Sequence, residues 1–270
     1  MTATQKYLFW SFPWIIASKE TIKKITTLQS LFFSIDFKES IMFKYETHLH
    51  TSPVSACASV TVRETLEFYK SISYDGIFIT NHFIDGNISF DHRDLPYEDK
   101  INFYFSDYEQ ALELSHEIGI KVFCGVEMSY GGSDFLVYGL DKQWYLAHPE
   151  IEQMKKSEEL AFLRENGAFI IHAHPFREAR YIDHIRLFPR GIDGVEVINA
   201  NRTDFENRMA RIYAENYGFL ESAGSDNHTA RVQKMLAGVC SDEPINSEAD
   251  FIEFVKQGKF KIFSMPNPMC

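Results

Sequence analysis

The sequence predicts an α/β protein in which strands and helices alternate. From about Phe43 onward, short runs of Ile, Val, Phe and Leu alternate with segments that carry helix-capping signals. This pattern is typical of a parallel sheet covered by helices on both faces. Polar residues follow the ends of many of these strands, and strand ends are neighbours in a closed barrel. We therefore expect a barrel rather than an open sheet.

The expected elements have clear boundaries. Strands are predicted over residues 44–49, 76–80, 121–127, 135–138, 168–172, 192–198, 219–223 and 259–263. Capping boxes, in which a Ser or Thr precedes a Glu by three residues, mark helix starts at Thr61, Ser106 and Thr203, with a weaker variant at Ser247. Glycine adopts the left-handed C-cap conformation cheaply, and glycines stand at the expected helix ends, at Gly119, Gly167, Gly218 and Gly258.

One domain is predicted over residues 42–270, preceded by an extension of doubtful status over residues 1–41. The patterned region begins only near Phe43, and Met42 directly precedes it, so Met42 is a candidate start of the working protein. An apolar stretch at residues 7–17 resembles a short signal-peptide core, but only Lys6 supplies positive charge before it. No run of about 18 apolar residues occurs, so we expect no membrane span and a cytoplasmic location.

The charge balance limits the partners. The 270 residues include 27 Lys and Arg against 38 Asp and Glu, a formal net charge of −11. A surface of this sign repels phosphate backbones, so double-stranded DNA is not expected as a partner. A small anionic substrate is compatible, because metal ions or Arg can reverse the field within one pocket. The four cysteines indicate no disulfide framework, and nothing in the sequence indicates an oligomeric state.

Histidines stand at the ends of several predicted strands. His48 and His50 close the first strand, and residues two apart on an extended segment point the same way, so both rings can reach one ion. Taken alone, such a pair is more often packed and hydrogen-bonded than metal-bound. His82 follows the second strand, and His172 and His174 follow a later one. The repetition of this placement indicates a shared site.

Two carboxylates follow strands in the same way. Glu127 ends the third strand, and Asp226 with His228 follows the strand at residues 219–223. A buried carboxylate is costly unless it is paired, protonated or bound to a cation. Each residue could by itself form an ion pair or a helix cap. Together, imidazoles and carboxylates are the ligand set of zinc, manganese and iron, so the sequence predicts a multinuclear metal site.

Five motifs in this order resemble those of the PHP (polymerase and histidinol phosphatase) family of metal-dependent phosphoesterases. In this sequence they are His48-x-His50, Thr80-x-His82, Gly125-x-Glu127, His174-Pro175 and Ser225-Asp226-x-His228. The resemblance covers Met42 to about Phe263. It implies a distorted seven-stranded (β/α) TIM-like barrel that holds two or three divalent ions, manganese, zinc or iron, at its C-terminal face.

The resemblance also implies how the ligands divide among the ions. The first ion would be held by His48, His50, Glu127 and Asp226. A second ion would share Glu127 and add His174. A third position would include His82 and His228.

Two positions depart from the family pattern. Many members carry an Asp or His a few residues after the His-x-His, but here the stretch includes Ser55-Ala56-Cys57. The third ion therefore lacks an obvious ligand, for which Cys57 could substitute, although a buried and inert thiol is the more usual role. Many members have a His where this chain has Asp134. Asp134 is either a ligand that favours a harder ion such as manganese or a solvent-facing loop residue.

The expected chemistry is hydrolysis of a small phosphomonoester. Two cations roughly 3.5–4 Å apart would lower the pKa of a bridging water, and the resulting hydroxide would attack phosphorus in line. His82 or His228 could donate the proton to the departing alkoxide.

Four further residues are expected around the substrate and the ligands. Guanidinium groups match phosphate geometry, which makes Arg177 and Arg202 candidate substrate clamps. An ordinary surface ion pair with Glu178 or Asp183 is the alternative for Arg177. Glu196 and Asn199 are expected to orient the ligand histidines.

Other functions stay open from the sequence. An amidohydrolase-like deaminase also uses a His-x-His and a late Asp, but it expects a modified Lys where this chain has Glu127. A non-catalytic accessory module should have lost its ligands, and most are kept here. A nuclease acting on single strands should show a basic tract with interleaved aromatics, which this sequence does not have.

Overall fold

The strands form two five-stranded sheets in the computed structural model, which describes residues 42–89 and 94–270. The expected extension over residues 1–41 lies outside the described residues. The first sheet has the order β10-β9-β1-β2-β3 and the second the order β4-β5-β6-β7-β8. The strands of the first are β1 (Phe43–Glu46), β2 (Gly76–Ile79), β3 (Lys121–Cys124), β9 (Met235–Ser241) and β10 (Lys261–Pro266). Those of the second are β4 (Val126–Tyr130), β5 (Ser133–Tyr138), β6 (Phe169–Ala173), β7 (Gly194–Asn199) and β8 (Leu220–Gly224).

Both sheets are mixed, so the expectation of a purely parallel sheet was wrong. β1, β2 and β3 are parallel to one another, and so are β6, β7 and β8. β5 is antiparallel to β4 and β6, and β9 is antiparallel to β1 and β10. Because β5 runs in the opposite direction, its first residues lie at the same edge as the last residues of its neighbours. Asp134 accordingly pairs with Ser129 of β4 and Ala173 of β6.

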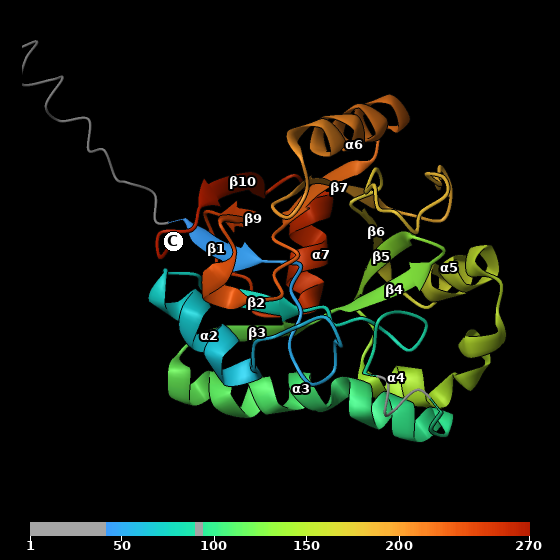
Figure 1. The fold of residues 1–270 in the computed structure, drawn as a ribbon, viewed down its shortest axis with the longest axis horizontal. Helices are drawn as coiled ribbons and strands as arrows, with labels where there is room; N and C mark the ends of the chain where they lie inside the picture. Colours follow the sequence, from blue (N-terminus) through green and yellow to red (C-terminus); the bar gives the residue numbers. More distant parts are fainter. Residues whose placement is uncertain (1–41, 90–93) are drawn as a thin grey trace, which may run out of the picture. The chain divides into compact units, whose positions relative to one another are not determined.

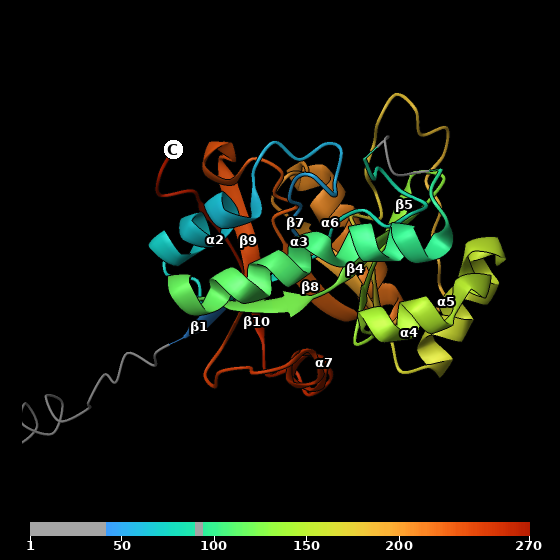
Figure 2. The same cartoon turned by 90° about the horizontal axis from the view of Figure 1, so that it is seen from below.

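Six α-helices pack around the sheets within the described part of the chain. They are α2 (Val62–Ser71), α3 (Tyr97–Ile118), α4 (Lys142–Ala147), α5 (Lys156–Glu165), α6 (Asp204–Tyr217) and α7 (Glu248–Lys256). Figure 1 shows α2 beside α3, and α6 packs on β7 and β8. In Figure 2, α2 and α4 contact the long helix α3 toward opposite ends. Among the described residues, no helix has the length and apolar character of a membrane span.

Most predicted helix boundaries are confirmed, with one exception. Capping boxes begin α2 at Thr61 and α6 at Thr203, and Gly119 and Gly218 end α3 and α6 in the left-handed conformation. The capping box at Ser106 was wrong, because α3 already begins after Pro96 and runs through this position. Ser106 Oγ instead donates a hydrogen bond to the carbonyl oxygen of Phe103, 2.7 Å away, one turn earlier in the same helix.

An aromatic cluster joins the two sheets. Phe78 of β2 contacts Tyr138 of β5 edge to face, with ring centroids 5.3 Å apart, and Phe251 of α7 packs against both. All three side chains are fully buried. Burial of each ring contributes roughly 1.5–3 kcal/mol relative to exposure. Packing on this cluster therefore holds the two sheets, and the strand ends that they carry, in a fixed relation.

Two single bridges also connect the sheets at their edges. Leu49, beyond the end of β1, pairs with Asn227, beyond the end of β8, and His82 after β2 pairs with Glu127 of β4. Both bridges are parallel. The described strand pairing contains no closed ring, so the observed architecture is a mixed α/β fold with two sheets. Both bridges involve residues that the sequence placed at or next to the metal site.

Candidate metal centre

All eight predicted metal ligands come together at one edge of the two sheets. Six of them follow β1, β2, β6 or β8, whereas Glu127 lies near the start of β4 and Asp134 near the start of β5. All are buried except His228, which is half-buried. Two of them, His174 and Asp226, have positive φ values of 28° and 52°. Non-glycine residues in this region are strained, and such strain is concentrated at functional sites.

Four side chains from three strands surround the first position. His48 Nε2 lies 3.2 Å from Glu127 Oε1 and 3.6 Å from Asp226 Oδ1. His50 Nε2 lies 3.3 Å from both His48 Nε2 and Glu127 Oε2, and 3.4 Å from Asp226 Oδ1. Donors held tetrahedrally at about 2.0–2.2 Å from a zinc ion lie roughly 3.3–3.6 Å from one another. His48, His50 and Glu127 therefore form one candidate donor group, and Asp226 Oδ1 lies at a similar spacing from both imidazoles.

A second group shares Glu127. His174 Nε2 lies 3.3 Å from Glu127 Oε1 and 3.9 Å from oxygens of both Asp134 and Asp226. The donor atoms of Glu127, Asp134 and His174 all lie within 4.8 Å of one another. Asp134 is a buried residue of β5, so its alternative interpretation as a solvent-facing loop residue was wrong.

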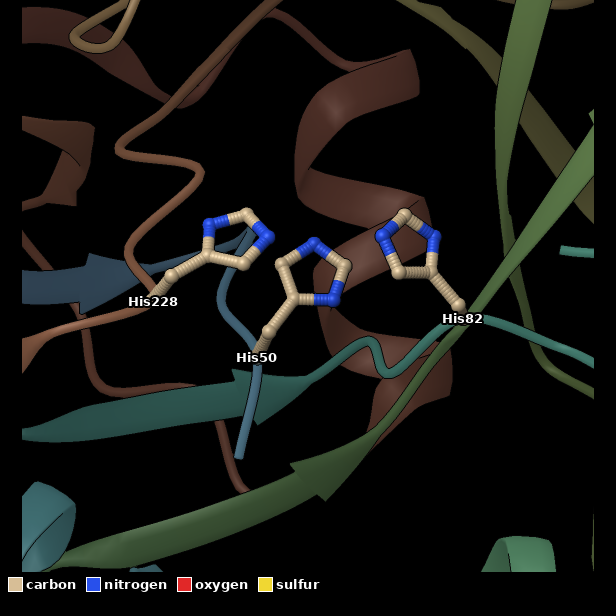
Figure 3. Close-up of side chains that lie close together, drawn as sticks. All are labelled: His50, His82 and His228. Atoms are coloured by element: carbon tan, nitrogen blue, oxygen red, sulfur yellow. The ribbon is translucent and has the colours of Figure 1, made fainter. Parts of the chain in front are cut away.

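A third group consists of histidines alone. Figure 3 shows the ring of His50 between the rings of His82 and His228, and the nitrogens of the three lie within 4.8 Å of one another. The ring centroids of His82 and His228 are 4.4 Å and 4.2 Å from that of His50, in stacked arrangements. Stacked imidazoles that present nitrogens to one another share a proton or a cation.

Glu196 contacts two of the predicted ligand histidines, and Asn199 contacts Glu196 and neither histidine. Glu196 Oε1 lies 2.9 Å from His48 Nδ1, and Glu196 Oε2 accepts hydrogen bonds from the His174 amide and from Asn199 Nδ2. A carboxylate on Nδ1 fixes the tautomer in which Nε2 is free to bind a metal. The contact therefore aims His48 Nε2 at the first position.

The sequence analysis missed several residues that hold the site. Glu46, fully buried, accepts hydrogen bonds from the amides of His48 and Ser225 and from the hydroxyl of Tyr69. Asp107 of α3 accepts hydrogen bonds from Thr51 and Asn81. Their partners are distant in sequence, so no local signal pointed to them.

The electrostatics of the site favour ionised carboxylates. Burial alone raises the pKa of Glu127 and Asp226, but the surrounding imidazoles hold both values well below the ordinary range. The largest of these contributions comes from His82 for Glu127 and from His48 for Asp226. Burial lowers the pKa of His48, but the carboxylates of Glu196, Glu127 and Asp226 raise it well above its usual value. The carboxylates are thus charged and ready to accept a cation.

A cavity of about 580 Å³ opens beside these groups. It is lined by His82, His228, Asp134 and Arg177, among others. Arg177 Nη2 lies 2.9 Å from Asp134 Oδ2, so Arg177 pairs with the site and not with Glu178 or Asp183. Arg202 follows β7 and does not line this cavity. Its positive charge contributes to the lowered pKa of Glu206.

Cys57 also lines this cavity. Its side chain is exposed, so the expectation of a buried, inert thiol was wrong. Partial desolvation raises its pKa, but hydrogen bonds with His228 and His82 outweigh that effect and lower the pKa to about 6.

The donor set fits divalent cations. Glu127 Oε2 is buried and accepts no well-aligned hydrogen bond from the described residues, although four imidazole nitrogens surround its carboxylate. A carboxylate in such a position is compensated when a cation lies between it and neutral imidazoles. Mixed imidazole and carboxylate donors suit zinc, manganese and iron.

Two solved structures have an arrangement of strands and helices that is similar to this one over most of the chain. One is a two-domain protein from Bacteroides vulgatus ATCC 8482, described as containing a predicted PHP-like metal-dependent phosphoesterase. It matches 82% of this chain with a TM-score of 0.59 and 15% identity. The chain has a PHP-like fold. This chain spans 64% of the length of the Bacteroides protein.

A second structure supports the same fold. PsfC from Pseudomonas syringae PB-5123 matches 83% of this chain and 91% of its own length, with a TM-score of 0.51 and 16% identity. No protein-family model and no curated protein matches the sequence. At these identities the similarity establishes the PHP-like fold, and the chemistry must be argued from the residues.

Proposed function

We propose that the protein is a metal-dependent phosphoesterase that hydrolyses a small phosphomonoester. The observation that carries this proposal is the donor group of His48, His50 and Glu127, with Asp226 within 3.6 Å of both histidines. Two or three divalent ions held there and at the neighbouring groups would supply an activated water and neutralise charge on the phosphate. Manganese, zinc and iron fit the donors.

The residues of the cavity have separate roles in this proposal. Arg177, whose guanidinium lies beside Asp134, would bind phosphate oxygens at the cavity wall. His228, half-buried at the mouth, or His82 would give a proton to the leaving alkoxide where its ring is not occupied as a metal ligand. Arg202 would act only on a substrate large enough to reach beyond the cavity.

The other functions receive less support. No lysine is among the described residues that line the cavity, whereas an amidohydrolase-like centre expects one at its middle. An accessory module would have lost ligands, and all eight side chains converge here.

We also propose that β1 to β8 form a distorted barrel of seven strands, in which β3 and β4 count as one strand. β3 and β4 are separated by Gly125 alone and act as one bent strand. The bridges Leu49–Asn227 and His82–Glu127 would then complete the ring. The single domain would be residues 42–270, which are compact by themselves.

The test is a phosphatase screen on protein stripped of metal and reloaded with Mn²⁺ or Zn²⁺. Asp226→Asn and His50→Ala should each lower kcat by at least about a thousandfold, because the ions contribute several kcal/mol of charge stabilisation. His116→Ala changes an exposed histidine of α3 outside the site and should leave activity unchanged. Phosphoester turnover that survives Asp226→Asn, or no turnover by metal-loaded protein, would overturn the proposal.

A further inference from the structure

The third group of donors lacks a ligand of its own. His50 Nε2 faces His48, Glu127 and Asp226, and its Nδ1 lies 3.1 Å from Ser55 Oγ. His50 Nε2 is therefore occupied at the first position, and His50 Nδ1 is occupied by a residue of the loop after β1. An additional ion between His82 and His228 needs another donor.

Each of the two remaining histidines has one nitrogen free for such an ion. His82 Nδ1 lies 2.8 Å from Glu127 Oε2, and His228 Nδ1 lies 2.8 Å from the carbonyl oxygen of Asp226. These contacts leave Nε2 of both rings for the cavity. Cys57 lines the same cavity as both rings, and its thiol is near enough to interact with each of them.

The backbone holds Cys57 in this place. On one side the Ala56 amide donates to the Asn87 carbonyl at 2.9 Å, and on the other the Ser59 amide donates to the His228 carbonyl at 3.0 Å. The loop is thus tied both to the segment after β2 and to the segment after β8. A donor fixed in this way loses little conformational freedom when it binds an ion.

The chemistry of these donors differs from that of the inner groups. The first two groups each contain carboxylates, which suit hard ions such as manganese. A thiolate with two imidazoles is instead a donor set that selects zinc, and three protein ligands leave a fourth position open.

We propose that Cys57, His82 and His228 hold a zinc ion at the mouth of the cavity, with the Cys57 sulfur as a direct ligand. When the ion binds, the S–H bond breaks, the sulfur keeps the electron pair and donates it to zinc, and the proton goes to solvent. The metal centre then contains one ion with a soft sulfur ligand beside ions whose ligands include carboxylates. This inference rests on the metal centre of the proposed function.

Metal analysis and cobalt spectroscopy test it without any assay of activity. Wild-type protein, stripped and reloaded with Zn²⁺, should hold one more zinc per chain than Cys57→Ser. Loaded with Co²⁺, it should show a near-ultraviolet thiolate-to-cobalt charge-transfer band that Cys57→Ser lacks. Cys270→Ser removes the other exposed thiol of the described residues and should change neither result. Cys57→Asp should regain the additional ion without the charge-transfer band, because a carboxylate with two imidazoles also binds divalent ions.

The outcomes separate this inference from the proposed function. If Cys57→Ser binds as many zinc ions as wild type, with the same cobalt spectrum, only the sulfur ligand is overturned. If wild-type protein binds no divalent ion at all, the metal centre itself fails.

A thiol reagent gives a second measurement that needs no change at residue 57. In Cys270→Ser protein, Zn²⁺ should protect Cys57 from alkylation and a chelator should restore its reactivity. Equal labelling with and without zinc would contradict a sulfur ligand.

Discussion

The two histidines of one strand end have opposite electrostatic environments. Burial lowers the pKa of both rings, but the carboxylates of Glu196, Glu127 and Asp226 raise that of His48 well above its ordinary value. His50 has like charges beside it, from His228 and His82, and its pKa is well below normal. The raised pKa favours the protonated ring of His48 before an ion binds, and Nε2 of this ring faces Glu127 and Asp226.

We expect ion binding to release this proton. Because the pKa of His48 is raised, the proton must leave before Nε2 can bind a metal, so lower pH opposes binding and higher pH favours it. Apparent affinity should increase by about tenfold per pH unit for each proton released. Isothermal titration in buffers of different ionisation enthalpy measures the number of protons. A binding heat that is the same in every buffer would contradict the prediction.

At this scale the sequence predicted which side chains converge, but not all of the residues that support them. Period-two spacing and position after a strand were enough to identify His48 and His50, and the contact of Glu196 with His48 was also foreseen. Glu46 was missed although it lies two residues before His48. Its partner Ser225 is 179 positions away, and only the folded chain brings the two together.

Strand ends can meet in the site because one glycine lets two backbones approach. A Cβ atom added to Gly224, the last residue of β8, would lie 2.5 Å from His48 Cβ and 2.8 Å from Glu196 Oε1. Such distances are too short for any side chain, so β8 can lie this close to the end of β1 only if residue 224 is glycine.

Gly224→Ala should therefore displace His48 and lower both stability and metal content. Overpacking of this kind costs roughly 1–3 kcal/mol. Gly218→Ala is the matched control, because Gly218 has φ of +69° at the end of α6 with nothing within 4 Å of an added Cβ. It should cost about 1 kcal/mol without changing metal content. Denaturant titration and metal analysis measure the two effects. Full metal occupancy in Gly224→Ala would show that the close approach does not matter for binding.

Elements were predicted best where local signals agree with tertiary packing. The capping boxes at Thr61 and Thr203 are examples. β9 was not predicted, although its sequence is largely apolar; Gly238, which favours no regular strand, stands at its middle. Gly238 packs against the backbone of Tyr45, a contact made by a residue distant in sequence.

At the scale of the whole molecule, the site joins the two sheets. His48 and His50 follow a strand of the first sheet, whereas Glu127, His174 and Asp226 belong to the strands of the second or follow them. The only other direct strand pairing between the sheets that the described residues show consists of two single bridges. An ion bound at the first position would therefore cross-link the sheets. The sequence predicted an α/β fold, but periodicity could not reveal that the strands divide into two sheets.

Removal of metal should therefore lower the thermal stability of the protein. An ion present at a hundred times its dissociation constant stabilises the folded state by about 2.7 kcal/mol. For a domain of this size that corresponds to a shift in Tm of roughly 5–10 °C. Differential scanning calorimetry with and without a chelator measures the shift, and Asp226→Asn should reduce it. A chelator without effect on a wild-type protein that was loaded with metal would contradict a cross-linking role.

The spread of the donors along the chain has a consequence for biosynthesis. Because they extend from His48 to His228, a nascent polypeptide that has left the ribosome only as far as β6 presents five of the eight donors and lacks His174, Asp226 and His228. The first group gains Asp226, and the third gains His228, only near the end of synthesis. We therefore expect the full set of ions to bind late in the synthesis of this protein.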